Sequence, residues 1–292
     1  MWLSPLAPAP AALVLGGDYL LTPRDGGEVV VWDTNLVESS RFTVAGIDSV
    51  TGSVCNDRGN LVMIARRNNQ VEVVEADLTG AFIRSYATGR FSLLRGSYID
   101  FDPTTRRYVF ADDDRLTLLD ADLGLVASSS PLFDRASGVA FGSDGFIYAT
   151  DQFESLIHRF TPGLALVESI PFSGWINTGI DASPDGSLLV SMFGDGAVDR
   201  FDPDTRARQN VVSGLGYGRV STVLELPDGS ILTAGTSLQL RSAGGSLLHT
   251  AAFSGDSVAL WQIPEPGVPA LAAAGVVLAL AGRRPRRATP AR

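Results

Sequence analysis

The sequence predicts an all-β protein built as a six-bladed β-propeller. A turn that ends in glycine recurs roughly every forty residues, and its anchor positions are Gly17, Gly59, Arg106, Gly145, Gly186 and Gly229. Each repeat carries short runs of β-branched and aromatic residues, such as LVMIA, YVFAD, FIYAT and LLVSM. These runs are about five residues long and are bounded by Gly, Pro or Asp, which favours strands over helices. Six anchors favour six blades over seven.

A second recurring residue position supports the repeat, because it follows the anchor at a nearly constant distance. The second strand run of each unit ends near an acidic or small polar residue, about fifteen positions after the anchor: Asp33, Glu75, Asp120, Thr161, Asp202 and Ser242. A single four-stranded sheet has two apolar faces and cannot bury both alone. The repeats are therefore expected to stack face to face in a ring, with Asp-Gly turns closing the hairpins.

The first segment of the chain, residues 1–12, resembles a degenerate or truncated signal peptide. It is apolar and rich in small residues, but it contains three prolines and no basic residue precedes Arg24. The propeller is expected to occupy residues 13–263.

The first repeat, GDYLLTPRDGGEVVVWDTN, has little chain before it that could form an inner strand. We expect residues 257–263, SVALWQI, to supply that strand and to close the ring. The alternative is that residues 12–17, ALVLGG, fill this position.

The units GVAFGSDGFIYATDQFESLIHRF and GIDASPDGSLLVSMFGDGAVDRFDP resemble NHL-type repeats. They resemble the gluconolactonase-like propellers more loosely. The resemblance covers residues 13–263 and implies the architecture of the blades, but it says little about chemistry.

The last segment, residues 264–292, has three parts. The tripeptide Pro264-Glu265-Pro266 precedes an apolar run from Gly267 to Gly282, and a basic cluster follows at Arg283, Arg284, Arg286 and Arg287. The prolines keep the chain extended, and the apolar run is expected to form a short helix that enters a bilayer. The arginines hold their end on the cytoplasmic side. The run rises roughly 24 Å as a helix, less than the ~30 Å hydrocarbon core.

This order of tripeptide, span and basic end resembles the PEP-CTERM sorting signal of Gram-negative bacteria, which an exosortase processes. The resemblance implies export, an inner-membrane intermediate, cleavage near Pro264–Pro266, and delivery to the cell surface or the extracellular matrix. A permanent anchor and a cytosolic tail are the alternatives.

Composition limits the partners. The chain has 292 residues and a net charge of -9, and residues 267–292 hold five arginines but no acid. The body is therefore strongly acidic, which excludes nucleic acid as an expected partner. Cys55 is the single cysteine, so no intrachain disulfide can form.

The candidate ligand face is formed by two sets of loops that a propeller brings to one side. One set joins each outer strand to the next inner strand, and the other joins the second and third strands of a blade. Aromatic and charged side chains there suit a polysaccharide or a protein ligand. The candidates are Arg95, Trp175, Asn177, Tyr217 and Arg219, and the second set carries Arg66, Arg67, Asp112–Asp114, Asp151, Glu154 and Asp195. Alternatively, the aromatics plug the channel and the charges are only solvated.

No catalytic residue is assigned, since the chain lacks Gly-x-Ser-x-Gly, His-Glu-x-x-His and Cys-x-x-Cys patterns. Gluconolactonase-like propellers would hold a metal with an Asn before a Gly and an Asp after the next strand. Asn177-Thr178-Gly179 approximates the first feature, but Ser191-Met192 stands where the Asp belongs. His158 and His249 lie in separate predicted strands, and His158 is expected on a strand surface.

No cofactor and no metal ligand are assigned, although a divalent cation such as Ca²⁺ at the channel is left open. The expected function is a non-catalytic binding or scaffolding module of the cell envelope or exopolysaccharide matrix. A metal-dependent lactonase or hydrolase is the alternative.

Overall fold

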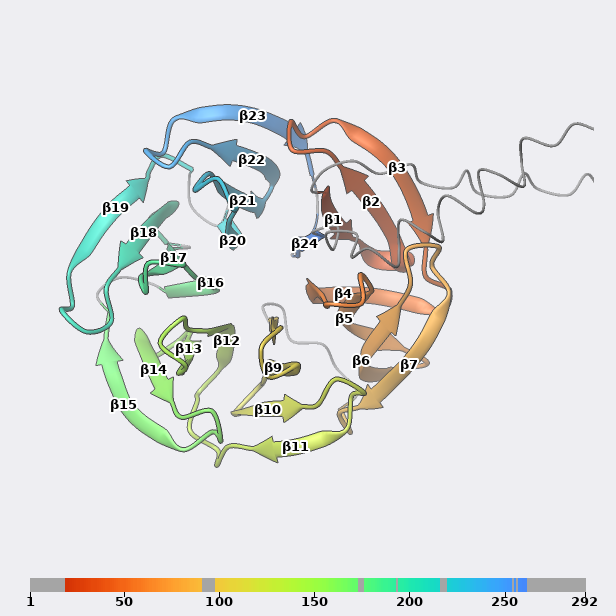
Figure 1. Cartoon of the computed structure of the whole chain (residues 1–292), viewed down its shortest axis with the longest axis horizontal. Helices are drawn as coiled ribbons and strands as arrows, with labels where there is room; N and C mark the ends of the chain where they lie inside the picture. The colour runs from red at the N-terminus through yellow and green to blue at the C-terminus, as the bar shows by residue number, and fades with distance from the viewer. Residues whose placement is uncertain are drawn as a thin grey trace, which may run out of the picture.

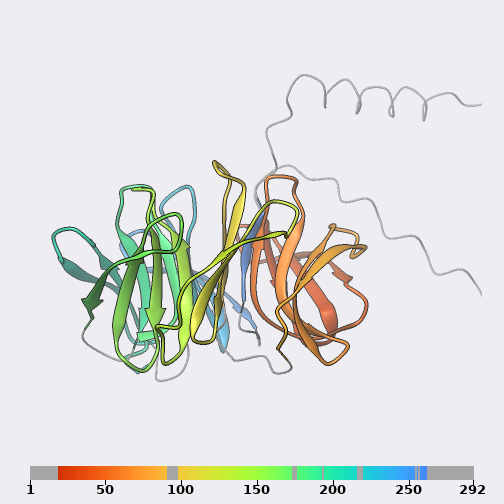
Figure 2. The same cartoon turned by 90° about the horizontal axis from the view of Figure 1, so that it is seen from below.

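The computed structural model describes residues 19–90, 98–172, 176–192, 194–215, 220–253, 255 and 257–261. The described residues form six four-stranded antiparallel sheets arranged as blades of a ring (Figure 1). The predicted six-bladed β-propeller is confirmed. Figure 2 shows the ring from the side, with the strands running between its two faces. The expected signal peptide and the sorting segment lie outside the described residues.

The strands of each blade follow one another from the centre of the ring to its rim (Figure 1). Blade 1 contains β24 (Ala259–Trp261), β1 (Tyr19–Pro23), β2 (Glu28–Trp32) and β3 (Glu38–Thr43), with the short 3-10 turn η1 (Asp25–Gly27) between β1 and β2. Blade 2 contains β4 (Ile47–Cys55), β5 (Leu61–Arg67), β6 (Gln70–Ala76) and β7 (Phe82–Ala87). Blade 3 contains β8 (Ile99–Asp102), β9 (Arg107–Asp112), β10 (Arg115–Leu119) and β11 (Leu125–Ser128).

The other half of the ring repeats this order. Blade 4 contains β12 (Ala136–Phe141), β13 (Ile147–Asp151), β14 (Leu156–Phe160) and β15 (Leu166–Pro171). Blade 5 contains β16 (Ile176–Ala182), β17 (Leu188–Met192), β18 (Ala197–Phe201) and β19 (Arg208–Val212). Blade 6 contains β20 (Val220–Glu225), β21 (Ile231–Gly235), β22 (Ser237–Arg241) and β23 (Leu247–Ala252).

The ring closes through blade 1, which combines strands from distant parts of the chain. The strand β24 pairs antiparallel with β1, with Trp261 opposite Tyr19 and Ala259 opposite Leu21. Figure 1 shows β24 beside β1 near the centre of the ring. The sequence prediction that residues 257–263 supply this strand is confirmed, and the alternative that residues 12–17 fill the position is wrong.

Both faces of each sheet are buried against neighbouring blades. In β5, Leu61 and Met63 face blade 1, whereas Val62 and Ile64 face blade 3. This alternation follows from the two-residue period of a strand. The hydrophobic clusters of the described residues each lie between two adjacent blades. The ring is therefore held together by blade-to-blade packing.

The predicted turn anchors adopt the expected backbone conformation. Gly59, Gly145, Gly186 and Gly229 all have positive φ, and so does Arg106 at the anchor of blade 3. A left-handed residue at this position closes the hairpin between the first and second strands of a blade. Arg106, the one anchor in this set that is not a glycine, thus has the same positive φ as the glycines.

The second sequence marker is a hydrogen-bonding turn residue. The Asp33 carboxylate accepts hydrogen bonds from the backbone N–H groups of Asn35 and Val37, at 2.9 and 2.8 Å. Such side chains replace a backbone partner in the turn between the third and fourth strands. The equivalent residues are Asp120, Thr161, Asp202 and Ser242.

In blade 2 the prediction that Glu75 is this turn residue is wrong. The turn residue there is Asp77, which accepts hydrogen bonds from Thr79 and Ala81. Glu75 lies within β6 with a fully buried side chain. Its carboxylate accepts hydrogen bonds from Asn56 and Asn60 and pairs with Arg84 at 2.9 Å. A buried acid with these partners belongs to the blade interior.

Among the described residues, no helix is long and apolar enough to cross a membrane.

Candidate functional site

The two predicted sets of loops contact each other on one face of the ring, which we call the loop face. Arg90 follows β7, and its guanidinium lies 2.6 Å from Asp112, 3.0 Å from Asp113 and 3.7 Å from Asp114. These aspartates stand at the end of β9 and in the turn that follows. Burial raises the pKa of Asp112, and Arg90 opposes this effect. The acidic run is therefore held in place by an arginine of the preceding loop.

Most of the predicted ligand-face residues lie outside the described residues: Arg95, Trp175, Tyr217 and Arg219. Asn177 lies in the inner strand β16 of blade 5. The same holds for the sorting segment, with Pro264, Glu265, Pro266, Arg283, Arg284, Arg286 and Arg287 outside the described residues. These assignments stay predictions.

An aromatic residue crosses the centre of the ring at Tyr98. Its hydroxyl donates a hydrogen bond to the carbonyl oxygen of Ser221 at 2.7 Å, and Thr222 Oγ1 donates to the same hydroxyl at 3.1 Å. Tyr98 precedes blade 3 and its partners lie in β20 of blade 6, on the opposite side of the ring. An aromatic side chain therefore links blades 3 and 6 across the ring. The sequence analysis did not single out Tyr98, and whether Trp175 and Tyr217 also fill the channel stays a prediction.

Two inner-strand aspartates link neighbouring blades. Asp100 in β8 accepts a hydrogen bond from the N–H of Phe141 at 2.8 Å, and Asp181 in β16 accepts one from Glu225 at 2.6 Å. Burial raises the pKa of Asp100 to about 6 and that of Asp181 to about 7. The backbone hydrogen bonds oppose these shifts without cancelling them.

Two residues of the sequence pattern compared with a gluconolactonase-like metal site, Gly179 and Ser191, are joined by hydrogen bonds. The buried hydroxyl of Ser191 accepts a hydrogen bond from the N–H of Gly179 at 3.0 Å and donates to its carbonyl oxygen at 3.2 Å. Blade 4 repeats the arrangement, since Thr150 accepts from Gly138 at 2.9 Å. The hydroxyl at this position secures an irregular inner strand to the second strand.

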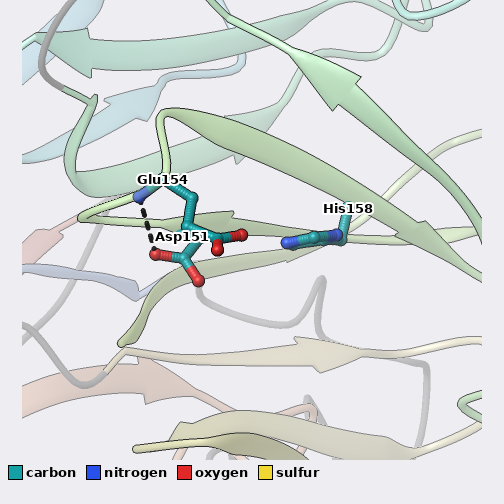
Figure 3. A group of neighbouring side chains, drawn as sticks. All are labelled: Asp151, Glu154 and His158. Atoms are coloured by element: carbon teal, nitrogen blue, oxygen red, sulfur yellow. Dashed lines mark hydrogen bonds between the residues drawn. The ribbon is translucent and has the colours of Figure 1, made fainter. Parts of the chain in front are cut away.

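A group of three potential ligand side chains lies where β13 turns into β14, at the loop face. It consists of Asp151, Glu154 and His158, whose nearest ligand atoms all lie within 4.8 Å of one another. Figure 3 shows the imidazole of His158 pointing toward the two carboxylates. No other group of this kind occurs among the described residues. We call it the blade 4 triad.

Asp151 and His158 are held rigidly. Asp151 accepts backbone hydrogen bonds from Asp134 at 2.8 Å, Phe153 at 2.9 Å and Glu154 at 3.2 Å. His158 Nδ1 lies 2.9 Å from Ser169 Oγ. Both side chains are almost completely buried, whereas Glu154 is exposed.

The prediction that His158 lies on a strand surface is wrong, because the side chain is only 1% exposed. It packs edge-on against the Phe133 ring, with centroids 4.9 Å apart. Burial lowers the pKa of its imidazole, and the nearby Asp151 opposes this effect. His249, in contrast, is exposed in β23.

A separate pocket of about 400 Å³ lies at the rim between blades 4 and 5. Phe172 and Phe201 form its apolar wall, and Arg206 and Arg208 contribute charge. The Arg208 guanidinium stacks 4.5 Å above the Phe172 ring and pairs with Asp199. The sequence did not predict this pocket, because its walls come from outer strands of two repeats.

Comparisons with known proteins identify the fold. No family model and no curated protein matches the chain. A solved structure of a protein of unknown function from Bacteroides caccae aligns with a TM-score of 0.61 at 10% identity, over 85% of this chain and 100% of that one. The structure of a streptogramin B lyase aligns with a TM-score of 0.61 at 16% identity, over 83% of this chain and 87% of that one. The chain shares its β-propeller architecture with both.

Proposed function

We propose that this chain is an exported β-propeller that is sorted to the cell surface and acts there as a non-catalytic binding or scaffolding module. Sorting depends on residues 264–292, through Pro264-Glu265-Pro266, the apolar run and the arginine cluster. An exosortase-type enzyme removes this segment from an inner-membrane intermediate. The propeller body then joins the envelope or exopolysaccharide matrix of a Gram-negative bacterium.

One observation carries the sorting part of the proposal. The strand that closes the ring, β24, ends at Trp261, three positions before the tripeptide begins. Cleavage at the tripeptide therefore leaves the described pairs between β24 and β1 intact. A removable segment needs this separation from the folded body.

The loop face is the binding surface in this proposal. It carries charged side chains fixed by ion pairs, such as Arg90 with Asp112, and the sequence analysis predicts Trp175 and Tyr217 on the same face. Aromatic faces and oriented charges are the groups that bind sugar rings and peptide polar groups. A polysaccharide or a protein of the matrix is the expected ligand.

The sorting step is tested in the bacterium that produces the protein. The tripeptide Pro264-Glu265-Pro266 is replaced by three alanines, and cell fractions are probed for the propeller body. We expect the variant to stay uncleaved in the membrane fraction while the unaltered protein reaches the surface. Pro269→Ala, a proline inside the apolar run, is the matched control and is expected to be processed normally. Recovery of the unaltered protein in the cytosol with its arginines intact would contradict the proposal.

The binding step is tested with extracellular polysaccharide purified from the same bacterium. Trp175→Ala and Tyr217→Ala are each expected to weaken binding about tenfold, measured by calorimetry. Phe82→Ala, which removes an exposed aromatic of the outer strand β7, is the control. Equal binding by all variants would refute this ligand face. Conversion of a lactone substrate by the purified body would instead favour the lactonase alternative.

A further inference from the structure

His158 presents a buried nitrogen that has no partner. Its Nε2 atom is buried and forms no hydrogen bond, although the other ring nitrogen, Nδ1, contacts Ser169 Oγ. A buried polar atom left unpaired destabilises the folded state. A proton on Nδ1, donated to Ser169, leaves the Nε2 lone pair directed at the carboxylates of Asp151 and Glu154 (Figure 3). The carboxylates repel this lone pair unless a positive charge lies between them.

The two carboxylates bring negative charge without a compensating cation. Within the described part of the chain, neither Asp151 nor Glu154 takes part in a salt bridge. Blade 3 differs at the equivalent loop, where Arg90 neutralises Asp112 and its neighbours. In blade 4 the arginine of the preceding loop, Arg135, lies over the Phe153 ring instead, 5.9 Å from its centroid. The blade 4 triad therefore has acidic ligands like those of blade 3, but no arginine pairs with them.

We propose that Asp151, Glu154 and His158 form a binding site for one divalent transition-metal ion, with Zn²⁺ as the best fit. His158 Nε2 supplies the nitrogen ligand, and the two carboxylates supply oxygen ligands. The site lies within a single blade at the loop face, and it goes beyond the sorting and binding roles proposed above.

The surroundings match those of known metal ligands. The other ring nitrogen of a ligating histidine is usually held by a hydrogen bond, and His158 Nδ1 lies within hydrogen-bonding distance of Ser169 Oγ. A ligating carboxylate is usually held by further hydrogen bonds, as Asp151 is by three backbone N–H groups. These contacts fix two of the three ligands before any metal arrives.

The third ligand can complete the geometry. In a tetrahedral zinc site the ligand atoms lie about 3.3 Å apart, closer than the 4.8 Å limit that the triad satisfies. Glu154 is exposed, and its carboxylate forms no hydrogen bond or ion pair among the described residues. It is therefore free to rotate toward the other two. The fourth position stays open to water.

The chemistry of the ligands selects the class of metal. An imidazole nitrogen with carboxylates suits Zn²⁺ and its first-row neighbours, whereas Ca²⁺ and Mg²⁺ prefer oxygen ligands only. We therefore expect Zn²⁺ to bind in the presence of millimolar Ca²⁺.

The test is metal binding by the purified protein without a polyhistidine tag. All proteins carry Cys55→Ser, so that the single thiol cannot contribute. After removal of metals by a chelator, ZnCl₂ is titrated calorimetrically and bound zinc is measured by mass spectrometry. We expect one zinc ion per chain. Glu154→Gln is expected to weaken binding about tenfold and His158→Asn at least about 100-fold.

Two matched controls separate the triad from general metal binding. Asp195→Asn changes the acid at the equivalent turn position of blade 5, and His249→Asn changes the other histidine of the chain. Both are expected to bind zinc as the parent does. Because Glu154 is exposed, Glu154→Gln is expected to fold. It therefore tests the site even if the buried His158 variant does not fold. The proposal fails if the parent binds no stoichiometric zinc, if Glu154→Gln binds like the controls, or if Ca²⁺ competes equally.

Discussion

Asp100 and Asp181 occupy equivalent places in blades 3 and 5, and each accepts a hydrogen bond from the next inner strand. Their raised pKa values mean that each holds its proton in the folded chain at a pH where the unfolded chain has lost it. A proton bound more tightly by the folded state stabilises that state, and the stabilisation is lost as the pH rises through the folded pKa. These residues therefore make the ring less stable toward neutral and alkaline pH.

Replacing Asp181 by asparagine is expected to flatten this dependence. Because the pKa of its carboxyl rises from 3.8 to about 7 on folding, that group lowers the free energy of unfolding by roughly 2 kcal/mol between pH 5 and pH 8. Asp181→Asn keeps an oxygen for the Glu225 N–H but cannot ionise. Urea unfolding at the two pH values measures the difference, with Asp195→Asn as a control outside the inner strands. An unchanged pH slope in Asp181→Asn would contradict the assignment.

Single residues were the hardest level to predict from sequence. The alternation around His158 predicted a strand, and the strand exists as β14. Alternation in a propeller does not mark one face as solvent, because both faces of a middle strand are covered by neighbouring blades. His158 is therefore buried, and its proximity to Asp151 depends on the pairing of β13 with β14.

At the scale of elements, the turns of one blade press on the outer strand of the preceding one. A Cβ atom at Gly245, between β22 and β23, would overlap the carbonyl oxygen of Val211 in blade 5. A Cβ atom at Gly80 would overlap the carbonyl oxygen of Thr43 in blade 1 in the same way. Both glycines also have positive φ. These turns therefore join neighbouring blades at the rim.

Gly245→Ala is expected to destabilise the protein by about 3 kcal/mol, because a methyl group there displaces the backbone of the preceding blade. Gly214→Ala is the matched control. Gly214 also has positive φ but has nothing within 4 Å of its added Cβ, so it is expected to cost only about 1 kcal/mol. Thermal and urea unfolding compare the two. If both variants lose the same free energy of unfolding, the positive φ accounts for the whole effect and the contact with the Val211 carbonyl oxygen contributes nothing.

Elements were predicted well wherever a turn repeated its chemistry. The anchors from Gly59 to Gly229 needed only the conformational preference of glycine, and Arg106 was found by spacing. Blade 2 misled the prediction because Glu75 and Asp77 are both acidic and lie two positions apart. Only the buried contacts of Glu75 with Asn56 and Arg84 distinguish the strand residue from the turn residue.

At the scale of the whole molecule, the ring depends on three paired positions between β24 and β1. Trp261 and Ala259 also belong to the hydrophobic cluster between blades 1 and 2. The first blade would lack its inner strand without them, and β1 would become an unpaired edge next to the channel.

Two shortened chains test this dependence. A chain ending at residue 263 keeps β24 and is expected to melt at the same temperature as the complete protein. A chain ending at residue 256 loses β24 and is expected to melt roughly 10 °C lower, because buried apolar contacts are lost. Calorimetric melting of both chains decides the point. A stable ring in the shorter chain would mean that another segment closes blade 1.

The number of blades and the manner of closure were predictable because the same pattern of turn and strand residues recurs in every repeat. The blade 4 triad and the pocket between blades 4 and 5 were not, since each depends on differences between repeats. Equivalent turn positions hold Glu154 in blade 4 and Asp195 in blade 5, yet only the first lies near a histidine.

The position of β24 also governs when the protein can finish folding. Synthesis proceeds from the amino end, so β1 is made early and waits for a partner produced some 240 residues later. During that interval five blades can stack in order, but the circle stays open. A chain interrupted at any earlier point exposes its unpaired first blade, which makes incomplete copies recognisable to proteases and chaperones.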